Sequence, residues 1–346
     1  MAPVYERVPP RLYGGTERVV HALTEELVRR GHEVTLFASA DSHTSARLVP
    51  VVDRPIWSHN RYHDPLPFHI LALGYVARHI DEFDIVHSHL DYLAFPLTRS
   101  LRRPVVTTLH GRLDLPELEP LFREFPDPPV VSISNSQRAP QPHVNWVATV
   151  YNGLDLSPFR FQPAPGKYLV FLGRISPEKG LDLAVAVALR AGVPLKIAAR
   201  MPLAPVLSRD AERDWAYYRE VVEPLLSHPL VEYVGEVSDE EKAQLLGGAL
   251  ALLFPIDWPE PFGLVMVEAL ACGTPVIARP VGSVPEVIEH GVTGFLASSV
   301  EELAAAVARV PELDRYACRR AAETRFSAAT MADGYERVYR RLLELS

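Results

Sequence analysis

The chain has 346 residues, of which 48% are hydrophobic and 23% are charged, a balance typical of a soluble globular protein. Its formal net charge is −8 and no block of basic residues stands out, which argues against nucleic acid as the main partner. No apolar run reaches the roughly 18 residues of a membrane span, and the two cysteines, Cys272 and Cys318, are too few for a disulfide framework. With no signal peptide after Met1, we expect a cytoplasmic protein, and peripheral attachment to the inner face of a membrane stays open.

The first half of the chain alternates apolar runs with helical periodicity. A helix is predicted over 16–30, because Val19, Val20, Leu23 and Leu27 share one face and Gly31 then ends the pattern. Strands are predicted at the short apolar runs 33–38, 84–89, 104–109 and 130–133.

The first strand looks shortened, because only residues 1–4 precede the polar residues Glu6 and Arg7. A strand missing from the middle of a parallel sheet would leave backbone groups unpaired, so we expect a weakened first domain if the chain begins at Met1. A protein with a longer amino-terminal segment and an unchanged melting temperature would contradict this expectation.

The pattern restarts after the proline-rich stretch 158–165, with strands predicted at 167–173, 195–199, 230–234, 249–254, 275–278 and 294–297. Apolar strands separated by helices indicate parallel sheets with crossover connections, in which ligands bind outside the carboxyl ends of the strands. We therefore predict an α/β protein with a first domain over 1–155, a second over 156–328, and a final helix within 329–346.

Two glutamates flank the predicted start of a helix over 264–271. Glu260 lies in a proline- and glycine-rich approach, and Glu268 is expected about two turns into the helix, which Gly273 stops. The backbone N–H groups at such a helix start form an anion site, so carboxylates on either side suit a ligand that carries both phosphate and hydroxyls. The alternative is two solvated helix charges.

A second motif covers 171–180, where a strand ends and a tight loop brings Arg174 and Lys179 to the edge of the sheet. Two fixed cations there can neutralise a pyrophosphate and stabilise the charge that grows on it as a bond breaks. The alternative is a surface loop in which Lys179 pairs with Glu178.

These motifs resemble those of retaining glycosyltransferases of family 4. Glu260 and Glu268, with Pro261, Phe262 and Gly263 between them, resemble the family's E-x7-E signature, 171–180 its G-R-x4-K-G element, and 9–18 its glycine loop. The resemblance implies the GT-B fold, with two Rossmann-like doubly wound domains, a cleft between them, and a final helix that crosses back to the first domain.

The resemblance also implies an activity and its residues. The chain would move a hexose from a nucleotide-diphosphate sugar to a hydroxyl acceptor, with UDP-glucose as the first guess for the donor and GDP-mannose as the second. Glu260 would contact the donor sugar, Glu268 the ribose, and Arg174 and Lys179 the leaving diphosphate. The donor-binding residues implied are Gly14, Gly15, Arg174, Lys179, Gly235, Glu236, Phe262, Gly263, Leu264, Val265 and Glu268. Arg200, at the end of the predicted strand 195–199, is a further donor-binding candidate that could reach the nucleotide or simply cap the edge of the strand.

In the first domain His87, His89 and His110 end two predicted strands, so their side chains should point toward the ligand side of the sheet. By resemblance His110 is a catalytic residue beside the donor sugar, and Asn135 lies on the acceptor side. His87 and His89 could suggest a metal, but there is no convincing third ligand, and a structural or acceptor-side role is favoured. The acceptor pocket is expected in the loops 40–70 and 111–128.

No metal or other cofactor is expected, because no D-x-D motif stands where a metal would be needed. The predicted partners are the sugar nucleotide and the acceptor, with a monomer or homodimer as the assembly. Alternatives are a sugar-nucleotide epimerase, a phosphorylase, and a sugar-nucleotide-binding subunit without catalysis. An epimerase would need acid and base carboxylates near the sugar, and none can be identified in the first domain of this chain. A phosphorylase would need a cofactor lysine and a longer chain.

Overall fold

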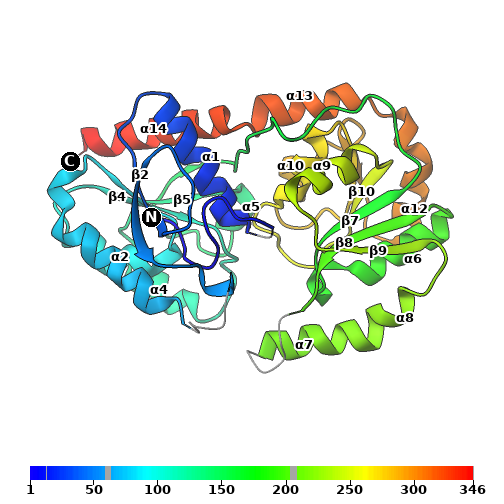
Figure 1. Ribbon diagram of the computed structural model, residues 1–346, viewed down its shortest axis with the longest axis horizontal. Coiled ribbons are helices and arrows are strands. Elements are labelled where there is room, and N and C mark those ends of the chain that lie inside the picture. Colours follow the sequence, from blue (N-terminus) through cyan, green and yellow to red (C-terminus); the bar gives the residue numbers. More distant parts are fainter. Residues whose placement is uncertain (13, 59–63, 203–208, 346) are drawn as a thin grey trace. The chain divides into compact units, whose positions relative to one another are not determined.

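The computed structural model describes residues 1–12, 14–58, 64–202 and 209–345 (Figure 1). The chain divides into two compact units: unit 1 is Met1–Asp155 with Arg325–Ser346, and unit 2 is Leu156–Thr324. The sequence placed the return to the first domain at 329, whereas unit 1 resumes at Arg325. The earlier return has a local cause, because Leu154 N–H donates to Phe326 O at 3.0 Å and Ala328 N–H donates to Leu154 O at 2.9 Å.

Unit 2 contains one sheet of six parallel strands in the order β12–β11–β10–β7–β8–β9. The chain runs outward from β7 to β9, returns to β10 beside β7, and runs outward again to β12. This is the doubly wound order of a Rossmann fold, and its direction reverses between β7 and β10, the place where such sheets bind ligands. The strands are β7 Leu169–Arg174, β8 Leu195–Arg200, β9 Val231–Gly235, β10 Ala251–Phe254, β11 Val276–Ala278 and β12 Gly294–Leu296.

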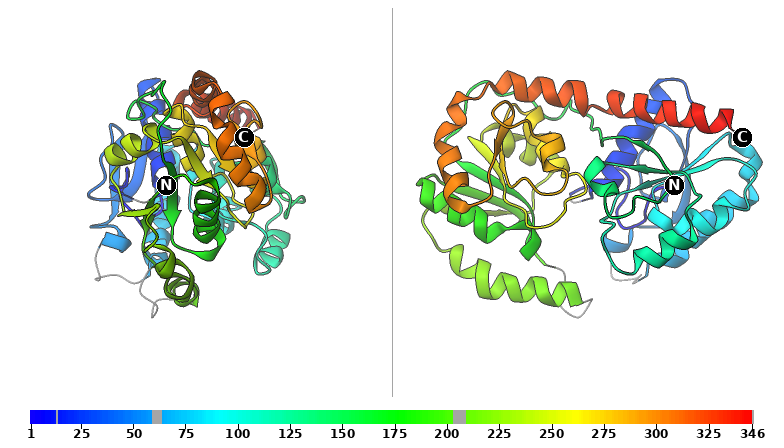
Figure 2. Two further views of the ribbon diagram at one scale, coloured as in Figure 1. Left: turned by 90° about the vertical axis from the view of Figure 1, so that its right-hand side faces the viewer. Right: turned by 180° about the vertical axis from the view of Figure 1, so that it is seen from behind.

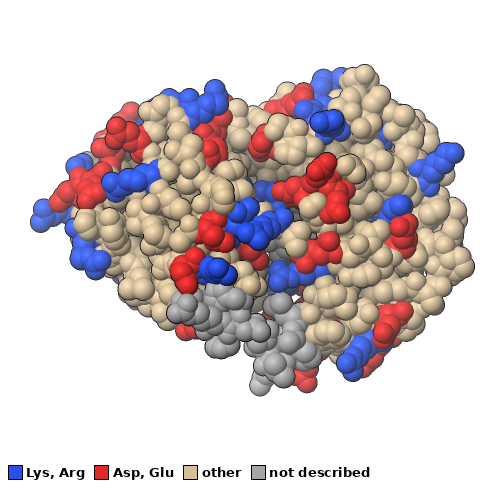
Figure 3. All heavy atoms as spheres, in the orientation of Figure 1, with Lys and Arg blue, Asp and Glu red and all other residues tan. Residues whose placement is uncertain are grey.

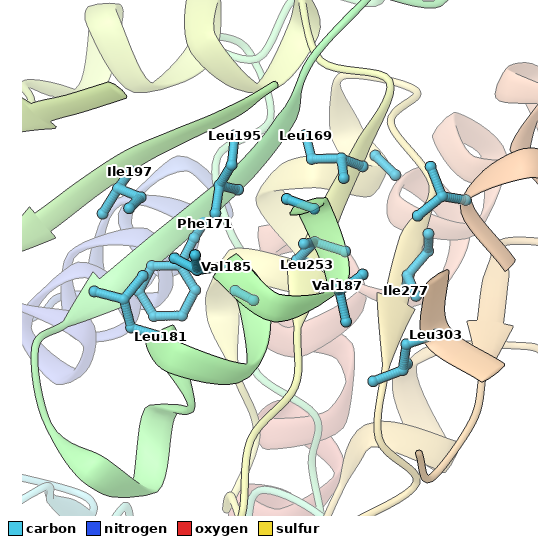
Figure 4. Close-up of a cluster of buried hydrophobic side chains, with 14 of the residues drawn as sticks. Leu169, Phe171, Leu181, Val185, Val187, Leu195, Ile197, Leu253, Ile277 and Leu303 are labelled. Atoms are coloured by element: carbon cyan, nitrogen blue, oxygen red, sulfur yellow. The ribbon is translucent and has the colours of Figure 1, made fainter. Parts of the chain in front are cut away.

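One face of this sheet packs against α6 and α12 and forms the largest described core cluster (Figure 4). Side chains that alternate along the strands, such as Phe171, Ile197 and Leu253, meet Leu181 of α6 and Leu303 of α12. Each fully buried side chain of this size contributes about 2 kcal/mol. The helices of unit 2 are α6 Leu181–Ala191, α7 Arg209–Tyr217, α8 Glu223–Leu225, α9 Asp239–Gly247, α10 Leu264–Ala271, α11 Val284–Val287 and α12 Val300–Arg309, and α13 Arg315–Arg325 reaches the boundary with unit 1.

Unit 1 contains a two-stranded parallel sheet, β1–β2, and a four-stranded parallel sheet, β3–β4–β5–β6. The strands are β1 Thr35–Ser39, β2 Arg47–Val52, β3 Val86–Ser88, β4 Val105–Leu109, β5 Val130–Ser132 and β6 Trp146–Thr149. The helices are α1 Gly15–Arg29, α2 Leu66–Arg78, α3 Phe95–Thr98, α4 Leu118–Glu124, α5 Asn135–Arg138 and α14 Ala328–Glu344.

The first two residues lie between these two sheets. The Met1 ammonium donates to His87 O at 2.8 Å and His89 N–H donates to Met1 O at 3.0 Å, while Ala2 N–H donates to Phe37 O of β1 at 2.9 Å. The segment is not a regular strand, as its shortness predicted, yet it hydrogen-bonds to strands on both sides and so joins β1 to β3.

Helix α14 lies along α1, as both figures of the ribbon show (Figures 1 and 2). The Arg30 guanidinium fixes the contact, because it donates to Asp333 Oδ1 at 2.7 Å and to Ala329 O at 2.8 Å. The predicted final helix is therefore present, and it packs within unit 1.

The sequence missed two strands, β2 and β6, and both are edge strands of their sheets. An edge strand is covered on fewer sides, so it needs no continuous apolar run. β2 even carries Pro50, which an edge strand tolerates because one side of its backbone pairs with no neighbour, and β6 is half-buried along its whole length.

Candidate functional site

The site of unit 2 lies where its strand order reverses, at the carboxyl ends of β7 and β10. β7 ends at Arg174 and leads into a short turn, Pro177–Lys179. β10 ends at Phe254 and leads through a loop, 255–263, into α10. Asp257 N–H donates to Glu178 O at 2.9 Å, so the two connections are joined directly.

Lys179 and Glu260 form an ion pair with a distance of 2.5 Å between Nζ and Oε2, and each side chain is only 12% exposed. The Trp258 indole N–H donates to the same oxygen at 2.8 Å, and the Lys179 ammonium lies 4.7 Å from the centroid of the Trp258 ring. The alternative in which Lys179 pairs with Glu178 is therefore wrong, because Glu178 instead accepts hydrogen bonds from Arg174 and Arg213, each at 3.2 Å.

The loop that carries Glu260 is held by the turn that follows β11. Ser283 N–H donates to Glu260 O at 3.0 Å, and its hydroxyl donates to Phe262 O at 2.9 Å. A Cβ at Gly282, whose φ is 61°, would lie 2.5 Å from Glu260 N and 2.6 Å from Glu260 O. Only glycine allows this close approach, so the backbone of Glu260 is fixed by its surroundings.

Glu268 is the fifth residue of α10, so it lies just over one turn from the start of the helix and not two. Its side chain is 6% exposed and forms an ion pair with Lys242 of α9, with 2.5 Å between Oε1 and Nζ. Lys242 also lies 3.2 Å from Asp239 and 5.6 Å from the centroid of the Phe159 ring. The alternative of two solvated helix charges is thus wrong for Glu260 and Glu268, since both carboxylates are largely buried and paired with lysine.

The remaining predicted residues of unit 2 lie along the same edge of the sheet. Arg174 and Arg200 end neighbouring strands and are paired in register, and the Arg174 side chain is 40% exposed. Gly235 ends β9, with Glu236 directly after it. Gly263 is the N-cap of α10, Leu264 and Val265 begin the helix, and Phe262 is buried beneath the loop.

In unit 1 the predicted glycine loop leads into α1. Gly14 is the N-cap with φ 155°, and a Cβ there would lie 2.7 Å from Pro10 Cβ, while Gly15 is the first helical residue. Behind the loop Glu17 is buried, and its carboxylate accepts a hydrogen bond from Glu6 N–H at 3.4 Å. Burial raises the pKa of Glu17 to about 7. Tyr13, which belongs to the same predicted loop, lies outside the described residues, as do residues 59–63 of the predicted acceptor loop.

The three predicted histidines of unit 1 lie together. The His89 and His110 rings are joined by a hydrogen bond of 2.9 Å between Nδ1 and Nε2, and Asp91 Oδ1 accepts from His110 N–H at 3.0 Å. Both ring nitrogens of His87 are engaged, with Tyr339 Oη and Thr108 Oγ1, each at 2.7 Å. These bonds to α14 and β4 favour a structural role for His87 over contact with an acceptor.

Burial lowers the pKa of His87 and of His89 well below the usual value for histidine, and it lowers the pKa of His110 to about 4. All three rings are therefore neutral at pH 7 and can act as hydrogen-bond partners. Asn135 begins α5, and its side chain bonds to Thr149 Oγ1 at 3.0 Å.

Comparison with known families agrees with this geometry. The family model described as Glycosyltransferase Family 4 matches residues 13–157, and the model described as Glycosyl transferases group 1 matches residues 158–325. The chain belongs to glycosyltransferase family 4. This family-4 glycosyltransferase has the GT-B fold, with parallel sheets in two Rossmann-like units.

The family-4 glycosyltransferase has relatives with different names. It is 26% identical to a phosphatidyl-myo-inositol mannosyltransferase of Mycolicibacterium smegmatis, over 87% of this chain and 82% of the relative. It is 27% identical to a glycogen synthase of Mycobacterium tuberculosis, over 96% and 92% of the two chains. The structure of Anabaena HepE, solved in complex with UDP and glucose, aligns with a TM-score of 0.71 at 21% identity and covers 94% of this chain and 96% of that one.

The sequence did not predict two residues that contact the signature glutamates in the glycosyltransferase's site. Lys242 is one of only four lysines in the chain, and that rarity was the available signal. Trp258 stands two positions before Glu260, but nothing in the spacing indicates that its N–H reaches that carboxylate. Both contacts depend on the tertiary placement of loops and helices.

On the face drawn in Figure 3, basic and acidic side chains of the glycosyltransferase are interspersed in small groups. Within residues 1–12, 14–58, 64–202 and 209–345, no three His, Cys, Asp or Glu side chains converge in an arrangement that could hold a metal ion. Over the same ranges, no helix combines the length and the apolar character needed to cross a bilayer.

Proposed function

We propose that this glycosyltransferase moves a hexose from a nucleoside-diphosphate sugar to a hydroxyl acceptor, with retention of configuration and without a metal ion. UDP-glucose is the first candidate donor and GDP-mannose the second. The proposal rests on one observation above all: both signature glutamates lie, buried and paired with lysine, at the end of the sheet where the strand order reverses.

The ion pairs support the binding of such a donor at this site. A diphosphate competes with Glu260 for the Lys179 ammonium, and the carboxylate so released can accept hydrogen bonds from sugar hydroxyls. Glu268 is fixed by Lys242 and would accept hydrogen bonds from the ribose. Arg174, with a partly exposed guanidinium, supplies a second cation to the diphosphate.

The reaction then needs little from the protein beyond placement and charge. The bond between the anomeric carbon and the diphosphate oxygen breaks, and the acceptor oxygen bonds to the same face of that carbon. The acceptor's proton passes to the departing phosphate. Arg174 and Lys179 stabilise the negative charge that develops on the diphosphate, the kind of electrostatic contribution that often dominates catalysis. We assign the acceptor to unit 1.

The names of similar proteins support both donor candidates. HepE was solved with UDP and glucose, and the M. smegmatis relative is named a mannosyltransferase. Both donors therefore enter the assay below as candidates.

A two-part assay tests the proposal. Thermal-shift measurements with UDP-glucose, GDP-mannose, UDP and GDP identify the nucleotide that stabilises the protein, since a ligand that binds only the folded state raises its stability. Release of the nucleoside diphosphate is then measured, with and without EDTA. Slow release that EDTA leaves unchanged supports a metal-independent transferase. Tight binding without release would support a non-catalytic subunit, and conversion of the sugar without release an epimerase.

A further inference from the structure

Trp258 contacts both members of the ion pair at the proposed donor site. Its indole N–H donates to Glu260 Oε2 at 2.8 Å, and the Lys179 ammonium lies 4.7 Å from the centroid of its ring. Among the described residues, both side-chain hydrogen bonds of the Glu260 carboxylate fall on Oε2. One aromatic side chain thus touches the anion through its edge and the cation through its face.

We propose that Trp258 is a positioning residue that holds Glu260 and Lys179 in place when the Lys179 ammonium exchanges Glu260 for a donor diphosphate as its partner. This inference rests on the proposed function, because it needs a ligand that replaces Glu260 as the partner of Lys179.

The backbone gives Trp258 a fixed location. Glu260 N–H donates to Trp258 O at 2.8 Å, which closes a tight turn between the two residues. Asp257, just before Trp258, donates to Glu178 O, and Ser283 N–H donates to Glu260 O. The backbone on either side of Trp258 is therefore held, on one side by the turn that carries Lys179 and on the other by the loop that carries Glu260.

Separation of the pair would otherwise be costly. Both side chains are 12% exposed, and a largely buried charge that loses its partner is strongly destabilised. When the diphosphate binds Lys179, the indole N–H stays on Glu260 and keeps the carboxylate oriented toward the sugar. The ring face meanwhile keeps the ammonium near its present position through a cation–π contact.

Tryptophan is the side chain that suits both tasks. Its indole N–H is a donor only, so it cannot compete with the sugar as an acceptor, and its ring is the best aromatic partner for a cation. Phenylalanine would keep a ring face and lose the donor, and leucine would lose both. The two substitutions therefore separate the two contacts.

The kinetic test compares Trp258→Phe and Trp258→Leu with the parent protein. Loss of a hydrogen bond to a charged group should lower kcat for donor turnover by roughly 10- to 100-fold in Trp258→Phe, with affinity for the nucleoside diphosphate alone within about twofold of the parent. Trp258→Leu should also weaken nucleoside-diphosphate binding. A Trp258→Phe protein with kcat and KM for the donor within about twofold of the parent would overturn the inference.

Trp146→Phe is the matched control. The Trp146 indole N–H also donates at 2.8 Å, to Gln141 O, and a cation, Arg138, also lies over its ring at 5.3 Å, but it belongs to β6 of unit 1. If replacement of a tryptophan by phenylalanine lowers kcat only by damaging the fold, kcat should fall in Trp146→Phe as well. The melting temperatures of both variants should then lie below that of the parent.

A second readout does not depend on turnover. The acylation rate of each lysine is measured by mass spectrometry. Lys179 should react several-fold faster in Trp258→Leu than in the parent, because the indole ring no longer shields its ammonium group from the reagent. Lys196, which pairs with Glu232 and lies 4.9 Å from the Tyr168 ring, should react equally in both. Equal rates at Lys179 would contradict the positioning role. If the parent neither binds nor turns over a sugar nucleotide, the proposed function fails. The labelling rates still test whether the Trp258 ring covers Lys179, because they do not depend on a sugar nucleotide.

Discussion

At the scale of single residues, the family-4 signature becomes a set of paired charges. Between Glu260 and Glu268 lie the end of the loop before α10 and the first turn of that helix. Each glutamate forms an ion pair with a lysine that is distant in sequence. The sequence indicated the glutamates, Arg174 and Lys179 because they are close together in motifs. It could not indicate Lys242 as the partner of Glu268, because the two are 26 positions apart and a complete strand, β10, lies between them.

Glu17, behind the glycine loop, gives a pH-dependent prediction at the same scale. Burial raises its pKa from 4.5 to about 7, so the folded state binds this proton more tightly than the unfolded state does, and stability is lost as the pH rises from about 4.5 to 7. Glu17→Gln removes this loss, which amounts to about 3 kcal/mol at roughly 1.4 kcal/mol per pKa unit.

The measurement is the difference in melting temperature between Glu17→Gln and the parent. We expect the variant's advantage to grow between about pH 5 and about pH 8. Glu25→Gln serves as the control, because Glu25 also lies on α1 but is partly exposed and has a lowered pKa. A difference that stays constant with pH would show that Glu17 is already ionised in the folded protein.

At the scale of elements, α14 is attached to the sheet of unit 1 through tyrosine hydroxyls. Tyr339 Oη bonds to His87 Nδ1, and Tyr335 Oη lies 2.9 Å from Thr108 Oγ1, which in turn contacts His87 Nε2. The sequence predicted the helix and the ends of the strands. It did not reveal that His87 serves this junction, because alternation along a strand gives the side of a residue and not its partner.

Tyr339→Phe tests this junction. Removal of the hydroxyl leaves a buried histidine nitrogen without its partner, so we expect a loss of about 1–3 kcal/mol in the stability of unit 1. Hydrogen exchange should become faster along α14 while exchange in β7–β12 stays unchanged. Tyr316→Phe, at an exposed position of α13, is the control, and equal exchange along α14 in the parent and Tyr339→Phe would contradict the assignment.

At the scale of the whole molecule, the sequence predicted two α/β units because their inner strands are apolar on both faces. All the predicted strands are present, and the strands that were missed lie at sheet edges. The order of the strands in unit 2, and hence the position of the site between β7 and β10, depends on pairing between segments distant in sequence, which no local pattern contains.

The buried histidines predict that the two units respond differently to acid. His69, His87, His89 and His110 all lie in unit 1 with a pKa lowered by burial, whereas unit 2 contains only His228 and His290. The neutral rings favour the folded state above about pH 6.5, and stability is lost as the pH falls from there to about 4. In Glu17→Gln, where protonation of Glu17 cannot offset this loss, protection against hydrogen exchange should therefore fall in unit 1 first during acidification, and a simultaneous fall in both units would contradict the prediction.

The most direct test of the donor site is calorimetric titration of the preferred sugar nucleotide into the parent, Lys179→Ala, Glu268→Ala and Lys196→Ala. Lys196 is the matched control, because it also pairs with a glutamate and lies over an aromatic ring in unit 2. We predict that Lys179→Ala and Glu268→Ala each weaken binding by roughly 10-fold or more, as expected for the loss of a charge-assisted contact, and that Lys196→Ala binds as the parent does. Parent-like affinity in both Lys179→Ala and Glu268→Ala would show that the donor binds elsewhere.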